Sequence, residues 1–189
     1  MLLLRVLRAA HRWAVLPRAD DSALTPTGER SAPLPALAVV NSLLRRAFLE
    51  GCTDMTRVKL QKMLFFLNGW HLAITGTPCL DRPFEVWKYG PVVRCVYDEL
   101  RRFQGRRVTE YLRDHESFKA YVVAEQHRFY EILDLTWDKY IGIDAARLST
   151  MCHAADTPWA TALKHGSRII SDEIIKTYFI ALARPARTT

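Results

Sequence analysis

Four side chains with reactive groups are the best candidates for catalysis in this sequence: Ser149, Cys152, His153 and the upstream His71. Ser149 and His153 stand four residues apart, so a helix would place them on one face. If the segment 69–73 met that helix in space, a serine or cysteine could lie within reach of an imidazole, as nucleophilic catalysis requires. One hypothesis is therefore a small hydrolase that uses Ser149 and His153.

The surrounding pattern favours a non-catalytic interpretation. His71 follows Leu60, Leu64 and Leu67 at helical spacing, which predicts a buried histidine hydrogen-bonded to the backbone. The chain has no local motif of a nucleophile with its base, a carboxylate pair or clustered metal ligands. We therefore expect no catalytic residue, no metal site and no cofactor.

Composition limits the classes of protein. The chain has 189 residues, of which 49% are hydrophobic and 25% charged, values typical of one globular domain. Its apolar runs fall far short of the ~18 residues that a membrane-spanning helix needs. The four cysteines form no C-x-x-C pair, which argues against a zinc knuckle and a disulfide framework. We expect free thiols at Cys52, Cys79, Cys95 and Cys152, and a cytoplasmic protein.

Residues 1–35 differ from the rest of the chain. The opening MLLLRVLRAAHRW mixes arginine with leucine and lacks the apolar stretch of a secretory signal, although a transit peptide or a surface-binding helix fits it. Prolines then recur among polar residues, as in a linker. We predict a poorly ordered Arg-rich extension and Pro-rich linker over 1–35, a domain over 36–184 and a tail over 185–189.

Helical periodicity dominates the predicted domain. Apolar stripes and capping residues predict helices over about 37–48, 57–75, 91–103 and 117–137, and shorter ones after Asp144, Thr157 and Ser171. Pro91 is expected in the first turn of the third helix. Pro83–Tyr89 reads as a strand rich in aromatic and β-branched residues, and Val108–Leu112 as its partner. The predicted fold class is mainly α, a compact helical domain with a small antiparallel β-hairpin (α+β).

Two blocks of the chain carry a family resemblance. The first reads LQKMLFFLNGWHLA from Leu60 and PFEVWKYGPVV from Pro83. The second block contains Leu148-Ser149, His153 and Pro158-Trp159, followed by the closing segment Ile174 to Leu182. Together they resemble the Panacea, or SocA-type, antitoxin domain of phage-associated proteins and toxin-antitoxin operons, over roughly residues 36–183.

The resemblance implies an antitoxin that neutralises a cognate protein toxin, encoded nearby, by direct binding. It also implies that such a protein can serve its toxin as an adaptor or chaperone, including delivery of the bound toxin to a cytoplasmic protease. The Arg-rich start and the four cysteines depart from the family pattern, and the resemblance supplies no role for them.

The resemblance also identifies a set of positions as candidate partner contacts. Trp and Tyr combine a large apolar area with a polar tip, as binding hot spots do, so Trp87 and Tyr89 are central. In the alternative, both rings fill the space between hairpin and helices, and Lys59 and Lys62 lie on the solvated face of an amphipathic helix. The candidate partner-binding residues are Lys59, Gln61, Lys62, Trp70, Trp87, Tyr89, Gly90, Pro91, Ser149, His153 and Trp159.

The formal net charge of +7 suggests a different function, a nucleic-acid-binding regulatory protein of phage or prophage origin. Arginines concentrate in residues 94–113 among aromatic residues, so phosphate contacts and base stacking are available there. Asp98 stands four residues from both Arg94 and Arg102, and ion pairs along the helix would neutralise part of this charge. We therefore expect a protein partner rather than nucleic acid.

Overall fold

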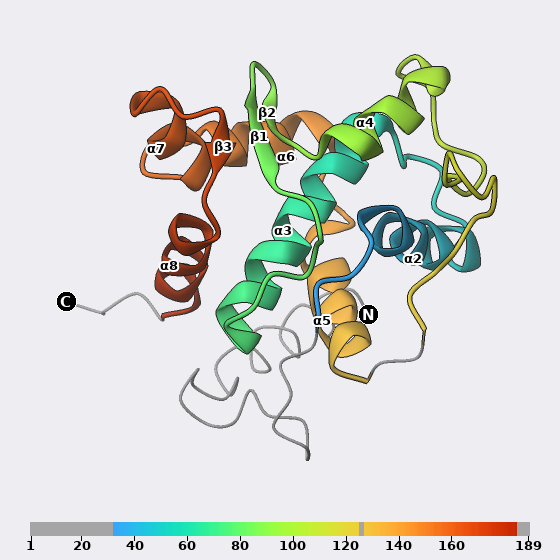
Figure 1. The fold of residues 1–189 in the computed structure, drawn as a ribbon, viewed down its shortest axis with the longest axis horizontal. Coiled ribbons are helices and arrows are strands. Elements are labelled where there is room, and N and C mark those ends of the chain that lie inside the picture. Colours follow the sequence, from blue (N-terminus) through green and yellow to red (C-terminus); the bar gives the residue numbers. More distant parts are fainter. Residues whose placement is uncertain (1–31, 125–126, 185–189) are drawn as a thin grey trace.

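The structure is a computed structural model that describes residues 32–124 and 127–184 (Figure 1). Its helices are α2 (Ala36–Leu49), α3 (Arg57–Thr75), α4 (Arg94–Leu100), α5 (His127–Tyr140), α6 (Ala145–His153), α7 (Pro158–Lys164) and α8 (Asp172–Ala183), with a 3-10 turn, η1 (Arg101–Phe103), after α4. The strands β1 (Phe84–Trp87), β2 (Gly90–Val92) and β3 (Ile169–Ile170) form an antiparallel sheet in the order β2-β1-β3. The predicted class, mainly α with a small antiparallel sheet, is confirmed. The predictions for residues 1–31 and 185–189 lie outside the described residues.

The central helix α3 is buried on every side. Helices α5, α6 and α8 and strand β2 pack around it (Figure 1). Thr56 caps its start by accepting a hydrogen bond from the Lys59 N–H, and Gly76 ends it in the left-handed conformation with a φ of 77°. Every side chain from Lys59 to Leu72 is buried. Polar groups on such a helix need partners within the protein, because water does not reach them.

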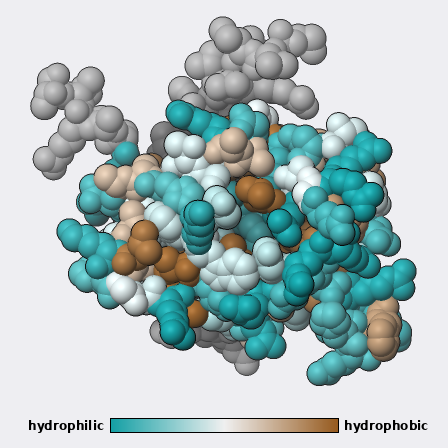
Figure 2. Space-filling view, turned by 90° about the horizontal axis from the view of Figure 1, so that it is seen from above, coloured by the Kyte–Doolittle hydropathy of each residue, from teal (hydrophilic) through white to brown (hydrophobic). Residues whose placement is uncertain are grey.

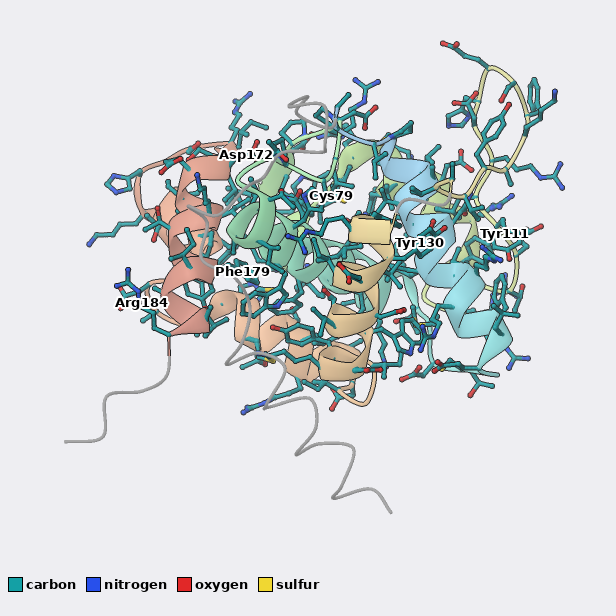
Figure 3. The ribbon with its side chains drawn as sticks, turned by 90° about the horizontal axis from the view of Figure 1, so that it is seen from below. Cys79, Tyr111, Tyr130, Asp172, Phe179 and Arg184 are labelled. Carbon is teal, nitrogen blue, oxygen red and sulfur yellow. The ribbon has the colours of Figure 1, made fainter. Side chains whose placement is uncertain are left out.

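Helix α8 packs closely against α3 at Gly69. A Cβ atom at this position would lie 2.2 Å from Cε2 of Phe179, so a larger residue does not fit. The Phe179 ring makes edge-to-face contacts with Phe65 and Trp70, with centroids 5.9 Å and 5.1 Å apart. Figure 3 shows Phe179 between the two helices. This aromatic cluster joins the last helix of the domain to its central helix.

The strand that pairs with β1 to close the hairpin is Gly90–Val92, not Val108–Leu112. Pro91 pairs with Val86, so it is a strand residue and not the first turn of α4. β2 lies at the edge of the sheet, where a proline costs no ladder hydrogen bond. The prediction failed because a proline before an apolar helical stripe also fits a helix start. The third strand, β3, was not predicted.

Residues 113–124 form a loop, whereas the sequence predicted the start of a helix there. The helix begins only at His127. The Asn41 side chain on α2 holds both ends of the loop: its Nδ2 donates to the carbonyls of Leu112 and Tyr121, each at 2.9 Å, and its Oδ1 accepts from the Leu112 N–H at 2.8 Å. A long-range hydrogen-bond clamp therefore overrides the apolar periodicity of this segment.

The three predicted capping residues all begin a helix. The side chains of Asp144, Thr157 and Ser171 each accept a hydrogen bond from the N–H three residues further along the chain. Across residues 32–124 and 127–184, none of the helices combines the length and hydropathy that crossing a bilayer requires.

Candidate functional site

Two adjacent polar side chains of α3 hold the backbone around β2. The Gln61 Nε2 donates to the Val93 carbonyl at 3.1 Å, and its Oε1 accepts from the Val93 N–H at 3.0 Å. The Lys62 ammonium donates to the Pro91 carbonyl at 3.0 Å. Lys62 is 1% exposed, and this burial lowers its pKa to about 8. The motif residues Gln61 and Lys62 thus fix where the chain leaves the hairpin.

The side chains of Lys59 and Trp70 also make hydrogen bonds within the protein, on other sides of α3. The Lys59 ammonium contacts the Asp54 carboxylate and donates to the Ile141 carbonyl at 2.7 Å. The Trp70 Nε1 donates to the Tyr140 hydroxyl at 3.0 Å. Both side chains are 1% exposed.

The prediction of a solvated face for Lys59 and Lys62 is wrong. It assumed that charged residues mark the outer side of an amphipathic helix, but α3 has no outer side along this stretch. Gln61 and Trp70 are buried as well. In this conformation these four side chains are not available to contact a partner directly.

An accessible aromatic surface lies over the β1–β2 hairpin. Tyr89 is 68% exposed at the turn, and the Lys88 ammonium lies 5.3 Å from its ring centroid. Trp87 is half-buried, and its Nε1 donates to a Glu85 carboxylate oxygen at 2.8 Å. The ring of Tyr97 on α4 lies 4.6 Å from that of Trp87. We call the five residues Glu85, Trp87, Tyr89, Arg94 and Tyr97 the hairpin surface.

Arg94 completes this surface from α4. Its guanidinium carbon lies 5.0 Å from the Trp87 ring centroid, and its nitrogens donate to both Glu85 oxygens at 3.0 Å and 2.9 Å. These hydrogen bonds from Arg94 hold the pKa of Glu85 below its ordinary value. The ion pairs predicted along α4 are absent from the described residues: Arg94 pairs with Glu85, and Arg102 with Glu110, in place of Asp98.

The second motif block supports the hairpin from behind. The Trp159 Nε1 donates to the Trp87 carbonyl at 2.9 Å, and the Ser149 hydroxyl donates to the Tyr89 carbonyl at 3.3 Å. The His153 ring meets the Trp159 ring edge to face, with centroids 4.3 Å apart. The two sequence blocks therefore come together in space, although about sixty residues separate them.

Gly90 lies where these supports converge. Its φ is 100°, and a Cβ atom there would lie 2.8 Å from the Lys62 ammonium nitrogen. Gly90 and Pro91 are both buried. The turn therefore needs glycine both for its backbone conformation and for the approach of the lysine.

The geometry does not support the hydrolase hypothesis. The Ser149 hydroxyl is bonded to a backbone carbonyl, and within the described part of the chain no hydrogen bond joins it to His153. The buried Nε2 of His153 has no partner there either. His71 is buried as predicted, with its Nδ1 2.9 Å from the Thr77 carbonyl oxygen, and burial lowers its pKa. Among the described residues, no three His, Cys, Asp or Glu side chains are grouped to hold a metal ion.

Sequence reasoning missed Glu85, Arg94 and Tyr97 as parts of the surface. The signals were present. Glu85 and Trp87 are two apart on a strand and so share a face. Arg94 and Tyr97 are three apart on a helix and so are neighbours. What the sequence did not show is that the strand and the helix meet.

The comparison with protein families decides the assignment. Residues 60–160 match the antitoxin SocA-like, Panacea domain family. The chain belongs to this family. The matched residues include the hairpin surface and the buried residues that hold it. The protein is also 29% identical over 172 residues to antitoxin SocA of Caulobacter vibrioides (strain NA1000 / CB15N), an alignment covering 82% of this chain and 88% of that protein. No solved structure matches. Family and relative together support an antitoxin-type role for this Panacea-domain protein.

Proposed function

We propose that the protein neutralises a toxin by binding it directly through the hairpin surface. The observation that carries this proposal is Tyr89, a large aromatic side chain that is 68% exposed on a turn with an immobilised backbone. Aromatic side chains supply much of the binding free energy at protein interfaces. The partner is a protein toxin encoded near this gene.

The supports behind the hairpin reduce the cost of binding. Lys62, Ser149 and Trp159 each donate a hydrogen bond to a hairpin carbonyl, so little backbone freedom remains to be lost when a partner docks. Preorganisation of this kind raises affinity without adding a contact. We assign Gln61, Lys62, Gly90, Pro91, Ser149, His153 and Trp159 to this positioning role, and Trp87 and Tyr89 to contact. Lys59 and Trp70 instead hold α3 against Ile141 and Tyr140.

The experiment is a titration of the protein with the purified product of the neighbouring reading frame. Tyr89→Ala and Trp87→Ala should each weaken binding by about 2 kcal/mol or more, the scale of interface hot spots. Leu163→Ala is the matched control, because Leu163 is 51% exposed on α7, outside the hairpin surface. Unchanged affinity in both aromatic variants, with thermal unfolding as in the wild type, would reject the hairpin surface as the contact.

We also propose that neutralisation is non-enzymatic. The basis is that Ser149 and His153 make separate contacts in place of a nucleophile and base pair. His153→Phe retains an aromatic ring beside Trp159 and removes the unpartnered nitrogen, so rescue from the toxin should match the wild type. Loss of rescue with folding and toxin affinity intact would favour the hydrolase.

An adaptor role for the same protein, with delivery of the bound toxin to a cytoplasmic protease, is a separate proposal that rests on the family. It predicts a shorter toxin half-life in cells that also express the antitoxin. An equal half-life with neutralisation retained would leave binding as the whole mechanism.

A further inference from the structure

A tight turn after α4 gathers four arginines at one end of the molecule. The chain reverses at Gln104 and Gly105, whose φ values are 49° and 86°. The turn is closed by hydrogen bonds from Gln104 N–H to the Arg101 carbonyl at 3.1 Å and from Arg106 N–H to the Phe103 carbonyl at 2.8 Å. Phe103 anchors it in the core at 9% exposure. We call residues 101–107 the basic turn; its arginines, all exposed, are Arg101, Arg102, Arg106 and Arg107.

Little of this positive charge is balanced within the protein. Arg102 has a carboxylate partner, Glu110, at 3.5 Å. Across the parts of the chain that the structure describes, Arg101, Arg106 and Arg107 form no ion pair. Like charges held close together repel, and the repulsion grows as salt is removed. Carboxylates from a partner would relieve it.

The basic turn continues the hairpin surface. Arg107 pairs with Thr56 in an isolated antiparallel bridge, and the Val108 N–H donates to the Met55 carbonyl at 2.8 Å. These contacts place the turn beside the start of α3. There the Arg57 guanidinium carbon lies 5.0 Å from the centroid of the Tyr97 ring, which belongs to the hairpin surface.

The figures show the same continuity. The hairpin and the turn after α4 both stand at the upper edge of Figure 1. Figure 2 looks onto this end and shows a mainly hydrophilic face with small hydrophobic patches. Such a face suits a partner that offers charge together with a few apolar side chains.

We infer that the hairpin surface and the basic turn form one binding surface, and that the toxin segment it receives is acidic. An apolar or aromatic residue of that segment packs on Tyr89, and its carboxylates pair with Arg101, Arg106 and Arg107. This inference rests on the proposed function and names the chemistry of the partner. Electrostatic complementarity of this kind speeds association and excludes partners with the wrong charge.

An acidic polypeptide fits this surface better than a nucleic acid does. Stacking of successive bases would need the rings of Trp87 and Tyr97 besides that of Tyr89, but Trp87 and Tyr97 already contact each other, and Arg94 and Arg57 lie over them. A short carboxylate-bearing segment uses the single exposed ring of Tyr89 and needs no further free ring and no long basic stripe.

The test is a charge reversal at the turn. In the full chain, Arg101→Glu, Arg106→Glu and Arg107→Glu are combined, and affinity for the purified neighbouring toxin is measured at about 50 mM and about 200 mM salt. We expect affinity to fall about tenfold or more, and the salt dependence to flatten. The control combines Arg45→Glu, Arg147→Glu and Lys164→Glu, an equal change in charge at exposed positions elsewhere. It should change affinity much less.

The outcomes separate this inference from the proposed function. If the toxin still binds after the reversal at the turn but does not bind Tyr89→Ala, the inference of an acidic toxin segment is wrong, and the hairpin surface remains the proposed contact. Failure of the wild type to bind the toxin overturns the proposed function itself. A single-stranded oligothymidylate of about 20 nucleotides is titrated in parallel. If the oligothymidylate binds more tightly than the toxin, and the reversal at the turn abolishes that binding, the surface binds the phosphates of a nucleic acid and the inference is wrong.

Discussion

The side chain of Gln61 makes two hydrogen bonds to the backbone of Val93, thirty-two positions further along the chain: it accepts from the Val93 N–H at 3.0 Å and donates to the Val93 carbonyl at 3.1 Å. An amide side chain presents a donor and an acceptor side by side, so it can replace a neighbouring strand at this point. The pair ties the central helix to the start of α4. It also explains why a polar residue stands within a helix that is buried on all sides.

The first prediction concerns this pair. Gln61→Met keeps the side-chain volume but leaves the Val93 N–H buried without a partner, and the Val93 carbonyl keeps only its hydrogen bond from the Tyr97 N–H at 3.0 Å. The free energy of unfolding should fall by about 2 kcal/mol or more, because the unsatisfied N–H costs about 1 to 3 kcal/mol and the lost hydrogen bond to the carbonyl adds about 0.5 to 1.5 kcal/mol. Urea denaturation measures the change. Leu67→Met, at a fully buried position of the same helix, should cost less than about 1.5 kcal/mol. Equal losses in both variants would show that the hydrogen bonds contribute nothing.

The second prediction compares two glycines with positive φ. Gly90→Ala brings a Cβ atom to 2.8 Å from the Lys62 ammonium nitrogen, whereas nothing lies within 4 Å of a Cβ at Gly105. In both variants backbone strain lowers the free energy of unfolding, by about 1 to 3 kcal/mol. Only Gly90→Ala also displaces a buried charge from the Pro91 carbonyl. Thermal unfolding should therefore show a clearly larger loss for Gly90→Ala, and a loss no larger than that of Gly105→Ala would contradict the packing described here.

The third prediction follows from the pKa of Lys62, which burial lowers from 10.5 to about 8. Between these values the unfolded chain holds a proton on this lysine that the folded protein has released, so the Lys62 contribution to stability increases as pH rises through this window. Its full size is about 3 kcal/mol, from 1.36 kcal/mol per pKa unit. The difference in unfolding free energy between the wild type and Lys62→Met should rise from pH 8 to 10.5.

Other groups also contribute in this range, including Cys152, whose pKa burial raises from 9.0 to about 12, so that its thiol ionises in the window only in the unfolded chain. The difference between two proteins cancels most of their effect. Lys164→Met, at an exposed position, is the control that removes one lysine away from the buried site. A flat profile for Lys62→Met would mean that Lys62 stays charged in the folded protein.

The fourth prediction concerns where the domain starts. The Leu34 N–H donates to the Cys79 carbonyl at 2.8 Å, and the Leu34 carbonyl accepts from the Asp81 N–H at 2.9 Å. A chain that begins at Ala32 should therefore unfold at the same temperature as the full chain. One that begins at Ala36 loses both hydrogen bonds and should be less stable. Insolubility of the chain that begins at Ala32 would mean that residues 1–31 are needed for folding.

The sequence predicted the elements whose signals are local. Thr56 and Gly76 mark the two ends of α3, and Asp144, Thr157 and Ser171 cap the starts of other helices. Such caps can be predicted because the capping side chain is hydrogen-bonded to the backbone only three residues away. Segments decided by distant contacts were predicted wrongly. Residues 113–124 are held by Asn41, some seventy residues earlier in the chain.

The candidate site shows the same division. The two motif blocks were found, and Tyr89 lies at the surface as a contact residue must. The burial of Lys59 and Lys62 was missed, because a lysine in a helical pattern is usually solvated. A clue was present: apolar residues follow Lys62 at five successive positions, Met63 to Leu67, which leaves no side of the helix for water.

The contact between Gly69 and Phe179 has a consequence for synthesis of the protein. Among the described helices α8 is synthesised last, yet its Phe179 covers the aromatic face of α3, which was synthesised more than a hundred residues earlier. Until α8 arrives, Phe65 and Trp70 have no cover on that side. The nascent chain therefore exposes an apolar surface until α8 has been synthesised, and a product that terminates before Asp172 should aggregate or be degraded.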